Sequence, residues 1–171
     1  MRTRFVGGFY GQLVSGLLWF ASAALAEWSS PRAGITTLVL GGVAVFPLTE
    51  LLLRLEGPRT ALSPENTLHG LGREVALVLP LSMPLLLPVT LYRATWFYPA
   101  MMILLGAHYL PFTFLYGMRM FTALSALLVG SGVLIAMYMP DNFSLGGWFT
   151  AAVLLLFAVI GRIGADHEHR T

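Results

Sequence analysis

Long apolar runs separated by short polar turns make up most of the 171-residue chain. A membrane-crossing helix needs about 20 apolar residues, because each residue advances the helix by about 1.5 Å through a hydrocarbon layer of roughly 30 Å. Six runs meet this requirement, at residues 5–28, 34–54, 75–92, 96–116, 120–139 and 147–163. The pattern predicts an all-α, polytopic membrane helix bundle with six transmembrane helices, and a single transmembrane domain over residues 1–171.

The third run is irregular, because Pro80, Pro84 and Pro88 recur within it every four residues. Each proline lacks the N–H that would bond the carbonyl one turn earlier. An unpaired carbonyl is costly in hydrocarbon unless neighbouring helices supply a partner. We therefore expect this span to be kinked and to be the one most enclosed by protein.

The first run has two interpretations, a cleaved signal peptide or a transmembrane span. Ala24-Leu25-Ala26 has the form of a signal-peptidase site. The apolar stretch over residues 5–26 is 22 residues long, however, whereas the apolar part of a signal peptide has about 7 to 15. Gly7, Gly11 and Ser15 also form a stripe of small residues that favours close helix packing. We expect an uncleaved N-terminal span.

The ten arginines, which are the chain's only basic residues besides histidine, indicate the orientation. With a cytoplasmic N-terminus, eight arginines fall on the inner side and two on the outer side, as the positive-inside rule requires. The outer pair is Arg32 and Arg93. The inner set is Arg2, Arg4, Arg54, Arg59, Arg73, Arg119, Arg162 and Arg170. We predict cytoplasmic N and C termini.

Composition excludes several classes of function. Charged residues make up only 11% of the chain, whereas a soluble domain has about 25%. The absence of cysteine excludes disulfides and thiolate ligands, and a net charge of +2 does not suggest nucleic acid as a partner. No H-E-x-x-H, G-x-S-x-G or phosphate-loop motif occurs, so we expect no enzyme activity and no cofactor. His167, Glu168 and His169 alternate along the tail and cannot share a helix face, so we also expect no metal site.

His108 is the strongest candidate for a functional residue. It follows Trp96 by 12 residues, about 18 Å along a helix, and so lies near the middle of the bilayer. Ionisable residues at that depth are costly and commonly mark functional sites. Tyr109 is adjacent, and Pro111 frees a carbonyl nearby. One interpretation is a proton-binding or substrate-orienting group on a polar path. The other is a neutral histidine that hydrogen-bonds a neighbouring helix and stabilises the bundle.

The first two runs supply further polar candidates. Glu50 and Arg54 have the i, i+4 spacing of a helical ion pair, so Glu50 either pairs at the inner interface or lines the mouth of a pathway. A polar stripe on the first run is expected to face protein, either for hydrogen bonding between helices or as part of a ligand path. Its members are Gln12, Ser15, Trp19 and Ser22. The candidate substrate-binding residues are therefore His108, Tyr109, Glu50, Gln12 and Trp19.

Two segments resemble a family of small bacterial multipass membrane proteins catalogued as a domain of unknown function. They are "FPLTELLLRLEG" on the second run and "LGAHYLPFTFLYGMRMF" joining the fourth and fifth. In that family a Gly-Ala-His-x-x-Pro-Phe/Tyr pattern precedes a Tyr-Arg/Lys turn. In this chain Gly117-Met118 separates Tyr116 from Arg119, which departs from the pattern. The resemblance implies a location in the bacterial cytoplasmic (inner) membrane and no particular activity. The positions that it marks as typical are Phe46, Pro47, His108, Tyr109 and Pro111.

Two classes of function agree with these observations. The first is a channel- or transporter-like bundle for a small solute or ion, with a polar site near His108. The second is a non-catalytic scaffold or accessory subunit of a larger complex, in which the polar residues only determine helix packing. The lipid bilayer is the expected partner, and assembly as a homo-oligomer is compatible with both. The two three-span halves could also form an inverted repeat, as in many transporters.

Overall fold

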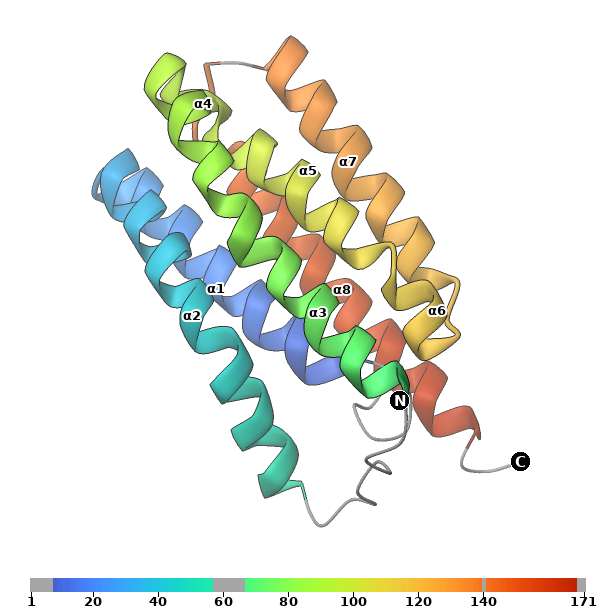
Figure 1. Cartoon of the computed structure of the whole chain (residues 1–171). Helices are drawn as coiled ribbons and strands as arrows, with labels where there is room; N and C mark the ends of the chain where they lie inside the picture. Colours follow the sequence, from blue (N-terminus) through green and yellow to red (C-terminus); the bar gives the residue numbers. More distant parts are fainter. Residues whose placement is uncertain (1–7, 57–66, 140, 169–171) are drawn as a thin grey trace.

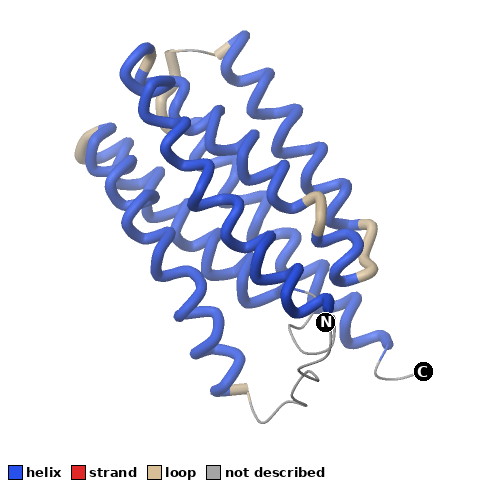
Figure 2. The backbone as a smooth tube through the Cα atoms, viewed as in Figure 1, coloured by secondary structure: helices blue, strands red, loops and turns tan. Residues whose placement is uncertain are grey.

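The computed structural model describes residues 8–56, 67–139 and 141–168, and within these ranges it leaves out the side chains of residues 67–69, 73 and 165–168. The described chain is helical and contains no strand (Figures 1 and 2). The helices are α1 (Phe9–Trp28), α2 (Pro31–Leu55), α3 (Thr67–Ser82), α4 (Leu86–Tyr92), α5 (Phe97–Tyr109), α6 (Phe112–Tyr116), α7 (Met120–Tyr138) and α8 (Leu145–Glu168). Short 3₁₀ turns, η2 (Met83–Leu85) and η3 (Ala94–Trp96), precede α4 and α5.

Within the described residues, five helical stretches are long and apolar enough to cross a membrane. They are Phe9–Trp28, Pro31–Leu55, Gly70–Tyr92, Met120–Tyr138 and Leu145–Gly164. Each coincides with one of the six predicted spans, which confirms an all-helical, membrane-type bundle. The exception is the fourth predicted span, residues 96–116, and the arrangement with six spans stays a prediction.

The fourth predicted span is divided into α5 and α6 at Leu110-Pro111. Pro111 has no N–H to bond the carbonyl of Ala107, and the N–H of Leu110 bonds that carbonyl instead at 3.3 Å. This tighter turn ends α5 at Tyr109, and a new helix begins at Phe112. The prediction of one continuous helix over residues 96–116 is therefore wrong at Leu110-Pro111. The break lies within two residues of His108.

The third predicted span is irregular as expected, but it is not enclosed by protein. The 3₁₀ turn η2 interrupts it around Pro84. All three prolines of the span are exposed, and only 11% of its most apolar window is buried, against 44% for the last span. Backbone carbonyls within the span are bonded locally, by Ser82 Oγ to Val78 and by Thr90 Oγ1 to Leu86, at 2.7 Å each. These bonds do not reach the carbonyls of Ala76, Pro80 and Pro84, which are the ones that the three prolines leave without a helical donor. The expectation that protein encloses this span is therefore wrong.

The helices form two groups. α1 packs along α2 and antiparallel to α8, so that the start of α1 and the end of α8 lie at the same end of the bundle (Figure 1). α5 packs along α7, while α3 makes only limited contact with α5. The two groups meet where α8 packs against α5 and α7, and large side chains are fully buried there. These include Phe97, Tyr98, Met102, Leu124 and Leu154.

Small residues allow the close approach of α1 and α8. A Cβ at Gly16 would lie 2.9 Å from the side chain of Leu155, and a Cβ at Gly147 would lie 2.9 Å from that of Ala23. Gly11 has no neighbour within 4 Å of such a Cβ, and Gly7 lies outside the described residues. The small-residue contact therefore uses a different face of α1 from the predicted stripe.

Candidate functional site

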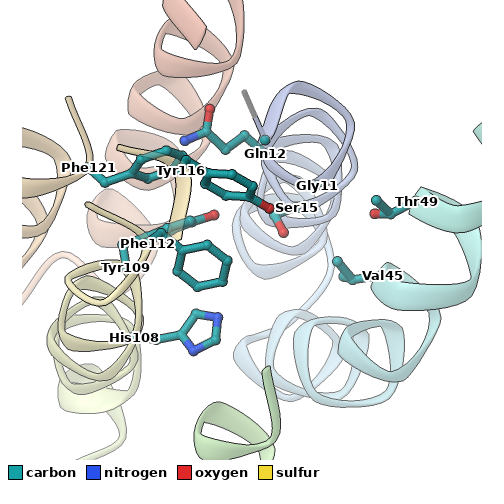
Figure 3. Close-up of a pocket in the computed structure, with 11 residues that line it drawn as sticks. Gly11, Gln12, Ser15, Val45, Thr49, His108, Tyr109, Phe112, Tyr116 and Phe121 are labelled. Atoms are coloured by element: carbon teal, nitrogen blue, oxygen red, sulfur yellow. The ribbon is translucent and has the colours of Figure 1, made fainter. Parts of the chain in front are cut away.

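A cavity of about 140 Å³ lies among α1, α2, α5, α6 and α7, and we call it the His108 cavity. Figure 3 shows its walls, with α1 and α2 on one side and the α5–α6 segment on the other. The residues that line it are Gly8, Gly11, Gln12 and Ser15 next to or on α1, Val45 and Thr49 on α2, His108, Tyr109, Phe112 and Tyr116 on α5–α6, and Phe121 on α7. The cavity therefore lies where the two helix groups face each other.

Local features of the sequence account for this space. Gly11 places no side chain at the cavity wall, and a Cβ at this position would have no neighbour within 4 Å. The break at Pro111 ends α5 after Tyr109, so His108 lies in the last turn of α5 and Phe112 starts α6. The rings of His108 and Phe112 meet edge to face, with centroids 5.2 Å apart. Tyr116 stacks on Phe112 at 5.5 Å, which continues an aromatic wall along this segment.

Three of the lining side chains carry buried polar atoms that have no hydrogen-bond partner. They are Nε2 and Oε1 of Gln12, Oγ1 of Thr49 and Nδ1 of His108. Gln12 is only 1% exposed. An unpaired buried polar group costs about 1–3 kcal/mol, so unpaired groups that concentrate at one place call for an explanation. Three of the six residues with such atoms in the described structure line this one cavity.

One side of the His108 ring contacts a neighbouring helix, and one of its nitrogen atoms has no hydrogen-bond partner. Its imidazole hydrogen-bonds the backbone of Val75 on α3, while Nδ1 has no partner. A neutral imidazole that donates through Nε2 presents Nδ1 as an acceptor. Tyr109, the next residue, is hydrogen-bonded to Ser15 and so joins α5 to α1 beside the cavity. Both interpretations of His108 agree with these contacts, since the side chain contacts a neighbouring helix and also lines a cavity.

The structure brings together three of the five predicted site residues, His108, Tyr109 and Gln12, at this cavity. Trp19 lies elsewhere, 2% exposed in the core with its ring 5.8 Å from that of Tyr98. Glu50 does not line the cavity either, although the preceding residue Thr49 does.

The predicted ion pair between Glu50 and Arg54 is absent from the ion pairs of the described residues. At that end of the bundle Glu56 pairs instead with Arg162 of α8 at 3.4 Å. The Arg162 guanidinium also lies 4.8 Å from the centre of the Phe9 ring. These contacts join the ends of α2 and α8 to the start of α1.

Sequence reasoning missed several lining residues. Thr49 was passed over in favour of its charged neighbour Glu50. Phe112 and Tyr116 follow His108 at intervals of four residues, a helical spacing that would have placed them on one face. Phe121 carried no distinguishing signal, because it is one of many apolar residues at the start of α7.

The half of the bundle beyond the cavity is closed by a cluster around Tyr98, which we call the Tyr98 cluster (Ser22, Gly34, Tyr98 and Gly147). Ser22 Oγ donates to the carbonyl of Gly34 at 2.8 Å and lies 2.6 Å from the Tyr98 hydroxyl. Ser22 and Tyr98 are both 0% exposed. A Cβ at Gly34 or Gly147 would lie within 3.1 Å of the Tyr98 side chain. Helices α1, α2, α5 and α8 therefore meet here without space between them.

Comparison with known families fits this architecture. A family described as of unknown function (DUF7010) matches residues 1–163, which is nearly the whole chain. The chain belongs to this family. The expectation of an uncharacterised family is thereby confirmed, and the DUF7010 match includes every residue of the cavity and of the Tyr98 cluster. No curated protein and no solved structure shows significant similarity to the chain. The role of this DUF7010 member has to be argued from its own residues.

Proposed function

We propose that this protein is a channel- or transporter-like membrane bundle, without enzyme activity, that binds or passes a small solute at the His108 cavity. The observation that carries the proposal is the set of four unpaired polar atoms, on Gln12, Thr49 and His108, around one cavity. A bundle that served only as a scaffold would gain stability from pairing or replacing these groups. Unpaired polar groups at a cavity cost little free energy if a solute or water supplies the missing hydrogen-bond partners.

The position of the cavity supports the same proposal. It lies between the α1–α2 side and the α5–α7 side of the bundle, and α2 packs mainly on α1. Transporters commonly bind their solutes between two helix groups that move relative to each other. The Tyr98 cluster closes the other half of the bundle. A cavity in one half of the bundle and close packing in the other half fit a binding site that opens to one side of the membrane at a time.

The distribution of arginine gives this site an orientation. With both termini in the cytoplasm of a bacterial cell, the cavity would lie in the inner half of the cytoplasmic membrane and the Tyr98 cluster in the outer half. The proposed protein is multi-pass, with an uncleaved first span. The proposed function does not require a homo-oligomer, since the cavity is formed by residues of one chain.

The first test asks whether water reaches the cavity, and the cysteine-free sequence makes it direct. Single-cysteine variants Thr49→Cys and Ser125→Cys are reconstituted in liposomes and treated with a small polar thiol reagent. The thiolate is the reactive form, so a cysteine in dry surroundings reacts slowly. We expect Thr49→Cys to react. Ser125, which is 6% exposed on α7 and does not line the cavity, provides the unreactive control.

The second test measures solute flux and thermal stability on the same His108→Ala sample. Liposome swelling is followed with urea, glycerol and potassium chloride as osmolytes. We expect wild-type protein to accelerate at least one of them over protein-free liposomes, and His108→Ala to change that rate with a small loss of stability. Membrane hydrogen bonds average about 0.6 kcal/mol, so the loss of stability should be modest. Absence of flux for every osmolyte, with an unreactive Thr49→Cys, would refute the proposal and favour a scaffold.

A further inference from the structure

We infer that the His108 cavity selects small uncharged solutes that carry a hydrogen-bond donor next to an acceptor, the chemistry of urea and simple primary amides. This inference rests on the proposed function and specifies its substrate class. It depends on four properties of the cavity, namely its size, its charge, its hydrogen-bonding groups and its aromatic wall.

The size of the cavity sets the first limit. Its volume is about 140 Å³. An engineered apolar cavity of about 150 Å³ in another protein binds benzene, so a cavity of this size accommodates one small molecule of up to about six non-hydrogen atoms. Sugars, nucleotides and most amino acids are larger than this. Molecules with four or five non-hydrogen atoms, such as urea and acetamide, are of the right size.

The charge of the walls sets the second limit. None of the described residues that line the cavity is an aspartate, glutamate, lysine or arginine. Glu50, adjacent in sequence to Thr49, is not among them. A charged solute would lose its hydration in a membrane-embedded cavity without gaining an opposite charge, which is very costly. The lining therefore favours solutes that carry no net charge.

The hydrogen-bonding groups define the solute more closely. Gln12 brings a carboxamide whose N–H donors and carbonyl acceptor are both unpaired. A carboxamide forms two parallel hydrogen bonds with a partner that displays an acceptor beside a donor, as glutamine does with the edge of adenine. Urea and primary amides display that pair. Thr49 can donate or accept, and Nδ1 of His108 adds an acceptor elsewhere on the wall.

The aromatic wall adds a preference for flat molecules. Phe112 and Tyr116 stack on each other, and in Figure 3 their rings lie between Gln12 and His108. Phe121 packs against both rings, with centroids 5.9 and 5.3 Å away. Ring faces offer broad contact to planar groups without any directional bond. Urea and amides are planar, whereas glycerol is not.

The decisive comparison is between urea and guanidinium, which have the same planar shape and differ in charge. Proteoliposome swelling is measured by light scattering with urea, acetamide, glycerol and guanidinium chloride at sub-denaturing concentrations. We expect urea and acetamide to enter faster than glycerol, and guanidinium to enter no faster than into protein-free liposomes. Entry of guanidinium at the rate of urea would overturn the selection by charge while leaving the proposed transport role intact.

Variants of Gln12 test the hydrogen-bonding step. Gln12→Leu removes the carboxamide at similar size, and we expect urea entry to fall by about tenfold, the effect of losing one good hydrogen-bonding partner. Ser125→Ala, on α7 and away from the cavity, is the matched control and should keep the wild-type rate. Melting temperatures identify any variant that does not fold. A folded Gln12→Leu protein with unchanged urea entry would overturn the inference.

A binding assay keeps the inference testable even if Gln12→Leu does not fold. In the Thr49→Cys background, acetamide should slow labelling by the thiol reagent, and guanidinium should not. Protection by neither compound, together with entry of inorganic ions, would refute the substrate class alone. Absence of flux for all solutes, charged or uncharged, would instead refute the proposed function on which the inference rests.

Discussion

The hydroxyl oxygens of Ser22 on α1 and Tyr98 on α5 lie 2.6 Å apart in the fully buried centre of the bundle. Ser22 at the same time donates to the carbonyl of Gly34 on α2. Three helices are thus joined through one serine, in a region where no charged side chain takes part. The contact is the centre of the Tyr98 cluster and joins the two helix groups in the half of the bundle away from the cavity.

Removing the Tyr98 hydroxyl should lower stability slightly without changing the fold. In Tyr98→Phe the ring still fills its site, and Ser22 keeps its bond to Gly34, so only one hydrogen bond is lost. Such bonds in membrane proteins are worth about 0.6 kcal/mol on average and about 1.7 at most. We expect a loss in this range, measured by thermal unfolding in detergent.

Tyr138→Phe is the control, because Tyr138 is 71% exposed at the end of α7. It should behave as wild type. A double-mutant cycle with Ser22→Ala then isolates the Ser22–Tyr98 term. Additive losses in that cycle would show that the two hydroxyls do not stabilise each other, contrary to the geometry.

The contacts of Arg162 at the other end of the bundle should contribute unequally to stability. The ion pair between Glu56 and Arg162 is partly exposed, at 26% and 43%, so Glu56→Gln should cost less than about 1 kcal/mol. Arg162→Ala also removes the guanidinium from the Phe9 ring, a contact worth about 0.5–1 kcal/mol in exposed positions. We expect Arg162→Ala to be the more destabilising change.

Chemical unfolding in mixed micelles measures both variants. Arg54→Ala is the matched control, because Arg54 is exposed near the end of α2 and has no ion pair in the described structure. It should have little effect. Equal losses for Glu56→Gln and Arg162→Ala would contradict the expected order.

The topology predicted from arginine can be tested with reporters. A reporter that works only in the cytoplasm should be active when fused after Thr171, and one that works only outside should be active within residues 140–145. Eight arginines against two across the expected membrane sides give the reason. Activity of the outside reporter at Thr171 would contradict the arrangement with six spans and both termini inside.

The helices were largely predictable because their signal is local. Length and apolar content suffice to identify a membrane helix, and five spans agree with the prediction. Whether protein encloses the third span was not predictable from length and apolar content. Whether Pro80, Pro84 and Pro88 face protein or lipid depends on which helices pack beside them, and nothing in that run specifies its neighbours. Pro111 was visible in the sequence, but one proline can kink a helix or end it, depending on its surroundings.

The cavity was predictable only in part, for a related reason. Polar residues are rare in these apolar runs, so Gln12, Tyr109 and His108 stood out by residue type. Successive residues on a helix point about 100° apart, so the choice between Thr49 and Glu50 depended on the rotation of α2 about its axis. Packing against α1 sets that rotation, and it directs Thr49 to the cavity.

Two glycines of α1 separate a role in solute passage from a role in packing. A Cβ at Gly11 meets nothing within 4 Å and projects at the cavity wall, whereas a Cβ at Gly16 would lie 2.9 Å from Leu155. Replacing a helical glycine by alanine stabilises the helix by about 0.8–1 kcal/mol when there is room. Gly11→Ala should therefore raise the melting temperature, while Gly16→Ala should lower it by overpacking, which typically costs about 1–3 kcal/mol.

Solute flux measured on the same samples distinguishes a role in solute passage from a role in packing. Gly11→Ala, and more strongly Gly11→Leu, should slow solute entry into liposomes because each places a side chain in the cavity. A change that stabilises a protein and impairs its transport is expected only if the space itself is used. Gly16→Ala should leave the flux per folded molecule unchanged, since Gly16 does not line the cavity. Full flux through a folded Gly11→Leu protein would exclude the His108 cavity as the path.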